Sequence, residues 1–302
     1  MNESTGQILL ITGGVGGAKL SLGFSKVYDS NSLSFIVNTA DDFEYLGLRI
    51  CPDIDTLLYN LSSQVDIERG WGVSDETWNC LDSLGQLGCE TWFKLGDRDL
   101  ATHVYRSYQM TRGRSLSEVT LDIARKFLIK SLIMPMSDDS VRTTLRTDQG
   151  DLDFQDYFVH KQCIPLIRSI SLDNVETSRP SPVLQDYFAN TSPQAIIICP
   201  SNPFLSIDPI LSVPGLCKLI LDSHAPVLAV SPIVNGDSLK GPTAKILTEF
   251  GMSVCAFEVA RYYQNKYPGL ISTFIIDNSD RELIGKIQEL GIDVFATDII
   301  MD

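Results

Sequence analysis

Four glycines near the start of the chain lie between a short apolar run and a segment with helical spacing of its apolar residues. They are Gly13, Gly14, Gly16 and Gly17, with Lys19 just beyond them. Because glycine lacks a Cβ, backbone amides here can approach a ligand closely, and a helix start adds about half a positive charge. The pattern is neither the dinucleotide fingerprint nor a Walker loop. It predicts a phosphate site, with a tight turn that holds no ligand as the alternative.

A second group of residues that could take part in chemistry is acidic. Asp41, Asp42, Asp53 and Asp55 lie within fifteen residues of one another, after a second apolar run. Carboxylates gathered beside a phosphate site repel the ligand unless a cation lies between them, and magnesium prefers oxygen ligands. We therefore expect Mg²⁺ as a cofactor. The alternative is that Asp53 or Asp55 caps the helix expected after Pro52.

Residues 92–99, with the sequence WFKLGDRD, place aromatic and charged side chains around one glycine. Trp92 and Phe93 can stack on a flat heterocycle, while Lys94 and Arg98 can meet phosphate or polar ring atoms. A solvated turn with an internal Asp–Arg pair is the alternative. Polar loops are also expected at three later strand ends, at residues 135–139, 200–203 and 231–236.

The elements that must position these residues alternate between strand and helix. Residues 7–12 and 34–38 have the composition of buried strands, and the glycines and a helix separate them, so the chain opens with a parallel β-α-β unit. Short apolar runs that predict further strands return after Pro180, at 195–199, 226–230, 272–276 and 293–296. We expect an α/β fold with a doubly wound, Rossmann-like parallel sheet. Ligands then lie beyond the carboxyl ends of its strands.

The middle of the chain has a different pattern. Residues 75–87 and 116–130 carry apolar side chains at three-to-four spacing, and Ser115 with Glu118 makes a capping box. Alternating segments predict a small, largely antiparallel sheet from 141–146, 152–159 and 164–171. We therefore expect a nucleotide- or phosphate-binding core from residues 1–60 and 190–302, interrupted by a helical and antiparallel insertion at 61–189.

Charge and composition exclude several classes of protein. The 302 residues include 24 Lys and Arg against 38 Asp and Glu, a net charge of −14, which argues against nucleic-acid and membrane-surface partners. No apolar stretch approaches the about 18 residues of a spanning helix, and no secretory signal is visible, so we expect a cytoplasmic protein. The seven scattered cysteines form no C-x-x-C pair and are expected to be reduced.

Taken in order, eight segments resemble the CofD family, the 2-phospho-L-lactate transferases of coenzyme F420 biosynthesis. They are GGVGGAK at 13–19, NTADD at 38–42, CPDIDT at 51–56, WFKLGDRDLATH at 92–103, PMSDD at 135–139, PSNP at 200–203, SPI at 231–233 and GPTAK at 241–245. The resemblance covers nearly the whole chain. It implies a magnesium-dependent enzyme that joins a guanosine-diphosphate-activated carboxylic acid to the deazaflavin Fo, forms a phosphodiester and releases GMP.

The same resemblance implies roles for individual residues. Asp42 and Asp53 are the implied metal ligands and catalytic residues, and either can orient the attacking hydroxyl. Fo is expected on five residues, Asp55, Lys94, Trp92, Arg98 and Asp99. The diphosphate or guanosine is expected on seven, Gly13, Gly14, Gly16, Gly17, Lys19, Ser201 and Asn202. Relatives also suggest a homodimer.

Two other functions remain as alternatives. A related branch of the superfamily resembles this glycine loop but binds nucleotide sugars, which would make the chain a regulatory binding protein; WFKLGDRD and CPDIDT favour the transferase. An NAD-dependent oxidoreductase rests only on the opening β-α-β unit, with Asp41 or Asp42 on the ribose. Leu46 stands where some relatives carry histidine, so the general base is assigned to a carboxylate or water. The residues leave open whether phospholactate, phosphoenolpyruvate or phosphoglycerate is donated.

Overall fold

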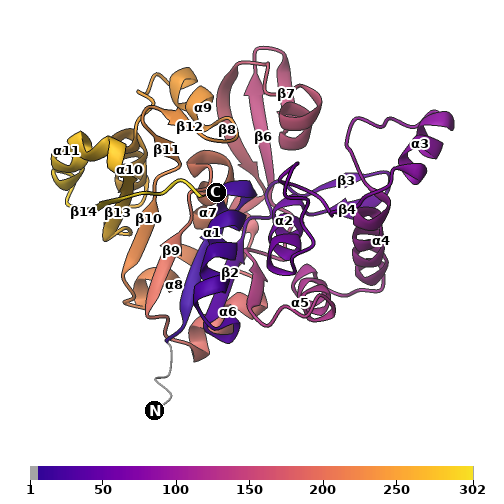
Figure 1. The fold of residues 1–302 in the computed structure, drawn as a ribbon, viewed down its shortest axis with the longest axis horizontal. Helices are drawn as coiled ribbons and strands as arrows, with labels where there is room; N and C mark the ends of the chain where they lie inside the picture. The colour runs from indigo at the N-terminus through magenta and orange to yellow at the C-terminus, as the bar shows by residue number, and fades with distance from the viewer. Residues whose placement is uncertain (1–5, 302) are drawn as a thin grey trace.

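A seven-stranded parallel sheet forms the centre of the computed structural model, which describes residues 6–301 (Figure 1). Its strands are β1 (Ile8–Thr12), β2 (Leu33–Val37), β5 (Leu132–Pro135), β9 (Ala195–Ile198), β10 (Val227–Val230), β13 (Thr273–Asp277) and β14 (Asp293–Thr297). In space they follow the order β14-β13-β10-β9-β1-β2-β5, and every neighbouring pair is parallel. The predicted doubly wound α/β fold is therefore confirmed.

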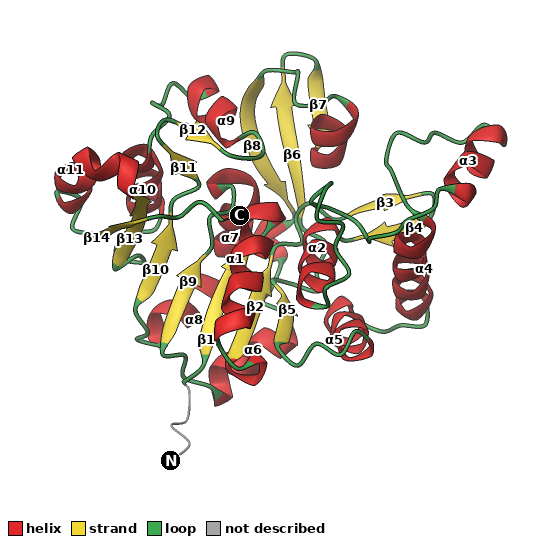
Figure 2. Cartoon of the chain, in the orientation of Figure 1, coloured by secondary structure: helices red, strands yellow, loops and turns green. Residues whose placement is uncertain are grey.

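Helices cover both faces of this sheet (Figure 2). Alternate residues of β1 serve the two faces: Ile8 and Leu10 pack in one hydrophobic cluster, and Leu9 and Ile11 in the other. The first cluster includes residues of α1 (Gly14–Val27), α2 (Pro52–Leu61) and α5 (Leu116–Lys126). The second includes residues of α6 (Pro182–Asn190), α7 (Asp208–Ser212), α8 (Leu216–Asp222), α9 (Thr243–Glu249), α10 (Ala256–Lys266) and α11 (Ile284–Gln288). Burial on both faces explains why the strands are continuous apolar runs.

Two smaller units adjoin the sheet (Figure 1). One, called the arm here, projects to the side and comprises the hairpin β3 (Phe43–Tyr45) and β4 (Leu48–Ile50) with α3 (Asn79–Gln86) and α4 (Asp97–Thr111). The other is an antiparallel sheet of β7 (Gly150–Asp153), β6 (Arg142–Thr147) and β8 (Ile167–Asp173). A short hairpin joins β11 (Ile233–Val234) to β12 (Asp237–Ser238), and brief helical turns are η1 (Ser30–Ser32), η2 (Asp156–His160), η3 (Val175–Thr177), η4 (Pro203–Ile207) and η5 (Asn278–Leu283).

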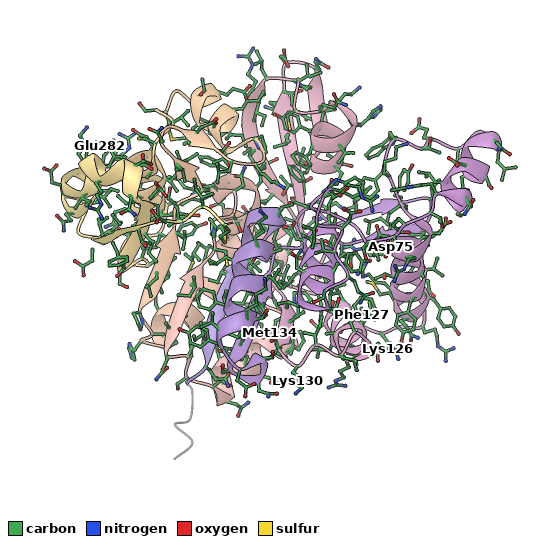
Figure 3. All side chains as sticks on the ribbon, in the orientation of Figure 1. Asp75, Lys126, Phe127, Lys130, Met134 and Glu282 are labelled. Carbon is green, nitrogen blue, oxygen red and sulfur yellow. The ribbon has the colours of Figure 1, made fainter. Side chains whose placement is uncertain are left out.

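Most predicted elements agree with the structure, and two differ from it. The capping box of Ser115 and Glu118 is present at the start of α5. The strand predicted at 152–159 stops at Asp153, because the next residues form the helical turn η2, which buries Tyr157 in the core. Residues 61–189 were predicted to be a helical and antiparallel insertion, but they include β5, which is an edge strand of the central parallel sheet. Its Met134 is fully buried among the side chains that fill the space beside the sheet (Figure 3).

The strand order determines where a ligand is expected. The chain turns back across the sheet between β1 and β9, and in open α/β sheets ligands occupy the crevice beyond the carboxyl ends of two such strands. β1 ends at Thr12 and β9 at Ile198, so the loops that begin at Gly13 and Cys199 border this position. Within the described residues no single helix is long and apolar enough to cross a membrane. The bent pair of helices Pro203–Ser212 and Leu216–Asp222, taken together, has the length and composition of a membrane span.

Candidate functional site

The loops that follow β1 and β9 are bonded directly to each other. The amide of Gly13 donates to Oγ of Ser201 over 3.2 Å, and that hydroxyl donates to the carbonyl of Gly13 over 2.7 Å. Ser201 is buried. Two segments that are 188 residues apart in the sequence, and that were both predicted to bind the diphosphate, therefore meet at the carboxyl edge of the sheet.

Glycine is required in the first loop because neighbouring atoms leave no room for a side chain. A Cβ on Gly13 would lie 2.7 Å from Oδ2 of Asp53, and one on Gly16 would lie 2.6 Å from the carbonyl oxygen of Pro200. Gly14 has φ +64°, in the left-handed region that favours glycine. The glycines therefore bring α1 close to the loop after β9 and to the segment that carries Asp41, Asp42 and Asp53, which is called the acidic loop here.

The start of α1 has the properties of an anion site. Gly14, Val15, Gly16 and Gly17 form the first turn, whose amides have no partner within the helix, and this turn contains no acidic residue. Asp53 Oδ1 accepts the amide of Gly14 over 2.7 Å. The remaining amides of the turn and the positive end of the helix dipole favour a negatively charged ligand.

Two of the acidic residues share a single donor. Asn38 Nδ2 donates to Asp41 Oδ2 and to Asp53 Oδ2, each over 3.0 Å. Burial raises the pKa of Asp53 to about 6, although its bonds with Asn38 and Gly14 oppose the shift. Burial and the charge of Asp53 raise the pKa of Asp41 as well. Each carboxylate is therefore held in a place where its own negative charge is unfavourable.

Asp42 lies beside them and has a different partner. Its Oδ2 is 3.2 Å from Nη2 of Arg49, on β4. Burial raises the pKa of Asp42 to about 6 even though the charge of Arg49 opposes the rise. Sequence reasoning placed the carboxylates close together, but it did not identify Asn38 as the shared donor of Asp41 and Asp53, or Arg49 as the counterion of Asp42.

Magnesium binding by these carboxylates stays a prediction. Within residues 6–301, no group of three or more His, Cys, Asp or Glu side chains is arranged to hold a metal. However, Oδ1 of Asp41 and Oδ1 of Asp42 are buried and have no hydrogen-bond partner in the described part of the chain. Mg²⁺ commonly uses one or two carboxylates, substrate phosphates and waters. Asp41, Asp42 and Asp53 supply that kind of ligand, and a substrate phosphate could complete the shell.

Lys19 and Asn202 have partners that could not be predicted from the sequence. Lys19 Nζ donates to the carbonyl of Met301 over 3.1 Å, so the segment after β14 lies close to α1. Asn202 Oδ1 accepts the amides of Phe204 and Leu205, which caps η4. The Nδ2 of Asn202 is buried and has no hydrogen-bond partner among the described residues.

The aromatic residues of the arm pack as one cluster. Trp92 has its ring centroid 5.5 Å from that of Tyr45 and 5.7 Å from that of Phe93. It also stacks on His160 of η2, at 5.3 Å and an interplanar angle of 13°. Lys94 is exposed, and no hydrogen bond or ion pair of the described residues joins it to the acidic loop. The arm therefore contacts η2, which lies between β7 and β8, through the stack of Trp92 on His160.

Three other predicted residues lie where α2 and α4 begin. Arg98 is exposed and donates to the carbonyl of Ser74. Asp99 and Asp55 are buried, and Asp55 pairs with the fully buried Arg106. The pKa of Asp99 is below its usual value. Burial acts to raise this pKa, but hydrogen bonding and charge from His103, and a hydrogen bond from the hydroxyl of Tyr59, lower it by more.

Arg106 and His103 were missed by the sequence reasoning. The available signal was their spacing, because positions 99, 103 and 106 fall on one face of a helix. The structure brings Asp55 and Asp99 into one buried network, and it brings the glycine loop, Ser201 and Asp53 into another. Contact with Fo or with a diphosphate remains a prediction for each of these residues.

Comparison with known proteins identifies the family. The family model of the 2-phospho-L-lactate transferase CofD matches residues 8–300. The chain is 36% identical to the 2-phospho-L-lactate transferase of Methanosarcina mazei, over 97% of this chain and 94% of the relative. It is 35% identical to the phosphoenolpyruvate transferase of Kitasatospora aureofaciens, over 98% and 92% respectively.

A solved structure supports the fold. The crystal structure of a UPF0052 family protein from Bacillus halodurans is similar with a TM-score of 0.62 at 15% identity, covering 97% of this chain and 92% of that one. The family match extends from the first strand to the segment after the last one, and it includes both loops of the site. The chain therefore belongs to the CofD family of transferases.

Proposed function

We propose that this protein transfers a phosphate-bearing carboxylic acid from a guanosine-diphosphate-activated donor to the deazaflavin Fo, as a step in coenzyme F420 biosynthesis. The observation that carries the proposal is the meeting of a glycine-rich helix start, which has no acidic residue in its first turn, with three buried carboxylates where the sheet order reverses. The names of the relatives support it, since they are a 2-phospho-L-lactate transferase and a phosphoenolpyruvate transferase.

The reaction forms one bond and breaks one bond at phosphorus. A hydroxyl oxygen of Fo attacks the phosphorus that bears the acid, and the bond from this phosphorus to the bridging oxygen breaks, so GMP leaves with both electrons. The hydroxyl proton passes to a carboxylate of the acidic loop or to water. In the absence of a metal, burial raises the pKa of Asp42 and of Asp53 to about 6, so whichever of these carboxylates does not hold the metal would be suited to accept this proton.

Magnesium would be held by Asp42 and Asp53, with Asp41 beside them. It would supply positive charge against the diphosphate and the carboxylates. Asn38 donates its amide hydrogens to Asp41 and Asp53, which supports the proposal that these two carboxylates are held in place before a ligand arrives. Such positioning contributes to catalysis because phosphoryl-type transfer depends on orientation and charge neutralisation.

The donor and the acceptor would occupy different sides of the acidic loop. The glycine loop, Lys19, Ser201 and Asn202 would hold the diphosphate or guanosine, and the free Nδ2 of Asn202 supports this assignment. Fo would lie against the arm, on Trp92, Lys94 and Arg98, with Asp55 and Asp99 behind them. Trp92 is half-buried and already stacks on His160, so Fo would lie against the part of this residue that His160 leaves uncovered.

We also propose a homodimer that uses the arm. Val104 and Tyr108 lie one turn apart on α4 and are 48% and 53% exposed. Burial of this apolar surface against a second copy would stabilise the pair. Light scattering at micromolar concentration is expected to give the dimer mass, and a monomer mass would contradict this proposal.

Product analysis tests the transferase. Fo would be supplied with each of the guanylyl-activated phospholactate, phosphoenolpyruvate and phosphoglycerate donors in turn, with Mg²⁺ and then with EDTA. Mass spectrometry is expected to show one dominant Fo phosphodiester and an equal amount of GMP, and EDTA is expected to abolish both. Folded protein that binds Fo but forms no product from any donor would count against the transfer reaction, and failure to bind Fo would favour a regulatory binding role.

A further inference from the structure

A continuous row of buried polar side chains connects α2 to α4, and we call it the ladder. Asp55 and Tyr59 contribute to it from α2, where they are one helical turn apart. Asp99, His103 and Arg106 contribute from α4, at spacings that place them on one helix face. All five side chains are buried, and Arg106 has no exposed surface.

The members of the ladder contact one another in sequence. Arg106 Nη1 donates to Asp55 Oδ2 over 3.0 Å, and its Nη2 donates to Oδ1 of the same carboxylate. The same Nη1 lies 3.2 Å from Nδ1 of His103. His103 Nε2 lies 3.1 Å from Asp99 Oδ1, within ion-pair range but without a hydrogen bond. The same oxygen of Asp99 accepts the hydroxyl of Tyr59 over 2.6 Å. The contacts begin and end on α2, so α2 and α4 are joined at two places, through Asp55 and through Tyr59.

Stability alone does not account for a charged pair in this position. Removing two charges from water is costly, and a well-packed apolar pair of similar volume commonly stabilises a protein as much or more. The pair between Arg106 and Asp55 does, however, fix a direction, because the planar guanidinium fork holds both carboxylate oxygens at once. The pair therefore holds the carboxylate of Asp55 in one orientation.

The ladder lies between the two halves of the proposed site. Asp55 is two residues from Asp53, in the same first turn of α2. α4 begins at Asp97, directly after the segment that contains Trp92 and Lys94. The ladder therefore fixes the aromatic end of the arm relative to the acidic loop. Each oxygen of Asp55 accepts one bond from Arg106 and has a second lone pair that can accept a ligand hydroxyl.

We propose that Arg106 is a positioning residue for the acceptor: it orients Asp55, and through the rest of the ladder it sets the distance between the acidic loop and the arm. This inference rests on the proposed transferase function. It assigns Arg106, His103 and Tyr59 an effect on acceptor binding without direct contact with Fo, and it assigns them no effect on donor binding.

The test compares Arg106→Lys and Tyr59→Phe with the control Arg112→Lys. Lysine keeps the charge but cannot grip both oxygens, and phenylalanine removes only the hydroxyl that bonds to Asp99. Arg112 is an exposed arginine at the end of the same helix. We expect Arg106→Lys to raise the KM for Fo by about tenfold or more while the donor KM stays within about twofold. Tyr59→Phe should give a smaller rise in the Fo KM, and Arg112→Lys should change neither KM.

Folded variants with an unchanged KM for Fo, or with equal rises in both KM values, would overturn the positioning role. If Arg106→Lys does not fold, Tyr59→Phe decides the question, because its ring still fills the same space. A wild-type protein without transferase activity would refute the proposed function but not the ladder. Titration of Fo fluorescence would then be decisive: weaker binding by the ladder variants is expected, and equal binding by all four proteins would overturn the inference.

Discussion

Two glycines of α1 offer a matched test of how the site is built. Gly16 and Gly23 lie in the same helix, and neither has a positive φ, so alanine suits the backbone at both positions. At Gly23 an added Cβ meets nothing within 4 Å, whereas at Gly16 it lies 2.6 Å from the carbonyl oxygen of Pro200. Gly16→Ala therefore adds this contact in the turn that is proposed to bind the diphosphate, whereas Gly23→Ala adds no contact and lies away from that turn.

The expected magnitudes follow from that contact. Alanine in a helix interior is favoured over glycine by about 0.5–1 kcal/mol, so Gly23→Ala should stabilise the protein by that amount. Gly16→Ala gains a similar term, but α1 and the loop after β9 must separate by at least 0.4 Å to bring the contact to 3.0 Å. Overpacking of this kind costs about 1–3 kcal/mol. A displacement between reactive groups that approaches 1 Å can lower the rate by about 100-fold.

Thermal unfolding and transferase rates measured on the same preparations check this prediction. We expect Gly23→Ala to melt at or above the wild-type temperature and to keep the wild-type rate. Gly16→Ala should melt a few degrees lower than Gly23→Ala and lose most of the activity. If the two variants have equal melting temperatures and equal rates, then the close approach of α1 to Pro200 does not organise the site, and the account of the glycine loop is wrong.

Three further predictions concern single side chains. Burial raises the pKa of Asp42 from 3.8 to about 6, so the stability that this group contributes is present below pH 3.8 and lost as the pH rises through 6. Between pH 4 and 7, the unfolding free energy of the metal-free wild type should therefore fall relative to that of Asp42→Asn, by about 3 kcal/mol at most. Urea titrations would measure this free energy against pH for both proteins, and parallel curves would contradict the raised pKa of Asp42. Asn202→Ala removes the oxygen that accepts two backbone amides, so it should lower stability by about 1 kcal/mol. It also removes the amide nitrogen that has no partner among the described residues, so it should weaken binding of the donor substrate more than binding of Fo. An unchanged KM for the donor substrate would remove Asn202 from the site. Trp92→Leu should raise the KM for Fo by about tenfold through lost stacking, and an Fo KM equal to that of the wild type would place Fo elsewhere.

The position of the site could be predicted because it depends on short-range patterns. Glycines directly after an apolar run mark the end of a parallel strand, and the carboxyl ends of such strands share one edge of the sheet. The Pro200 loop follows another such run, so its contact with Gly13 required only that both strands belong to the same sheet. The acidic loop follows β2, the neighbour of β1, and was placed by the same reasoning.

The partners of the site residues could not be predicted in the same way. Arg106 is 51 residues from Asp55, and their contact depends on how α4 packs against α2, which no local pattern specifies. Similarly, β5 has only four residues and follows a helix, so its sequence does not distinguish a sheet strand from a loop. Tertiary packing decides both cases, and it also decides which carboxylate of the acidic loop receives Arg49.

The measurement that tests the central claim most directly follows one oxygen atom. Fo labelled with oxygen-18 at its terminal hydroxyl would be converted by the wild-type protein with Mg²⁺ and an activated donor, and both products would be weighed by mass spectrometry. Attack by this hydroxyl on phosphorus predicts that the label remains in the new phosphodiester and that GMP carries none. Absence of product, or a product that has lost the label, would contradict the proposed transfer.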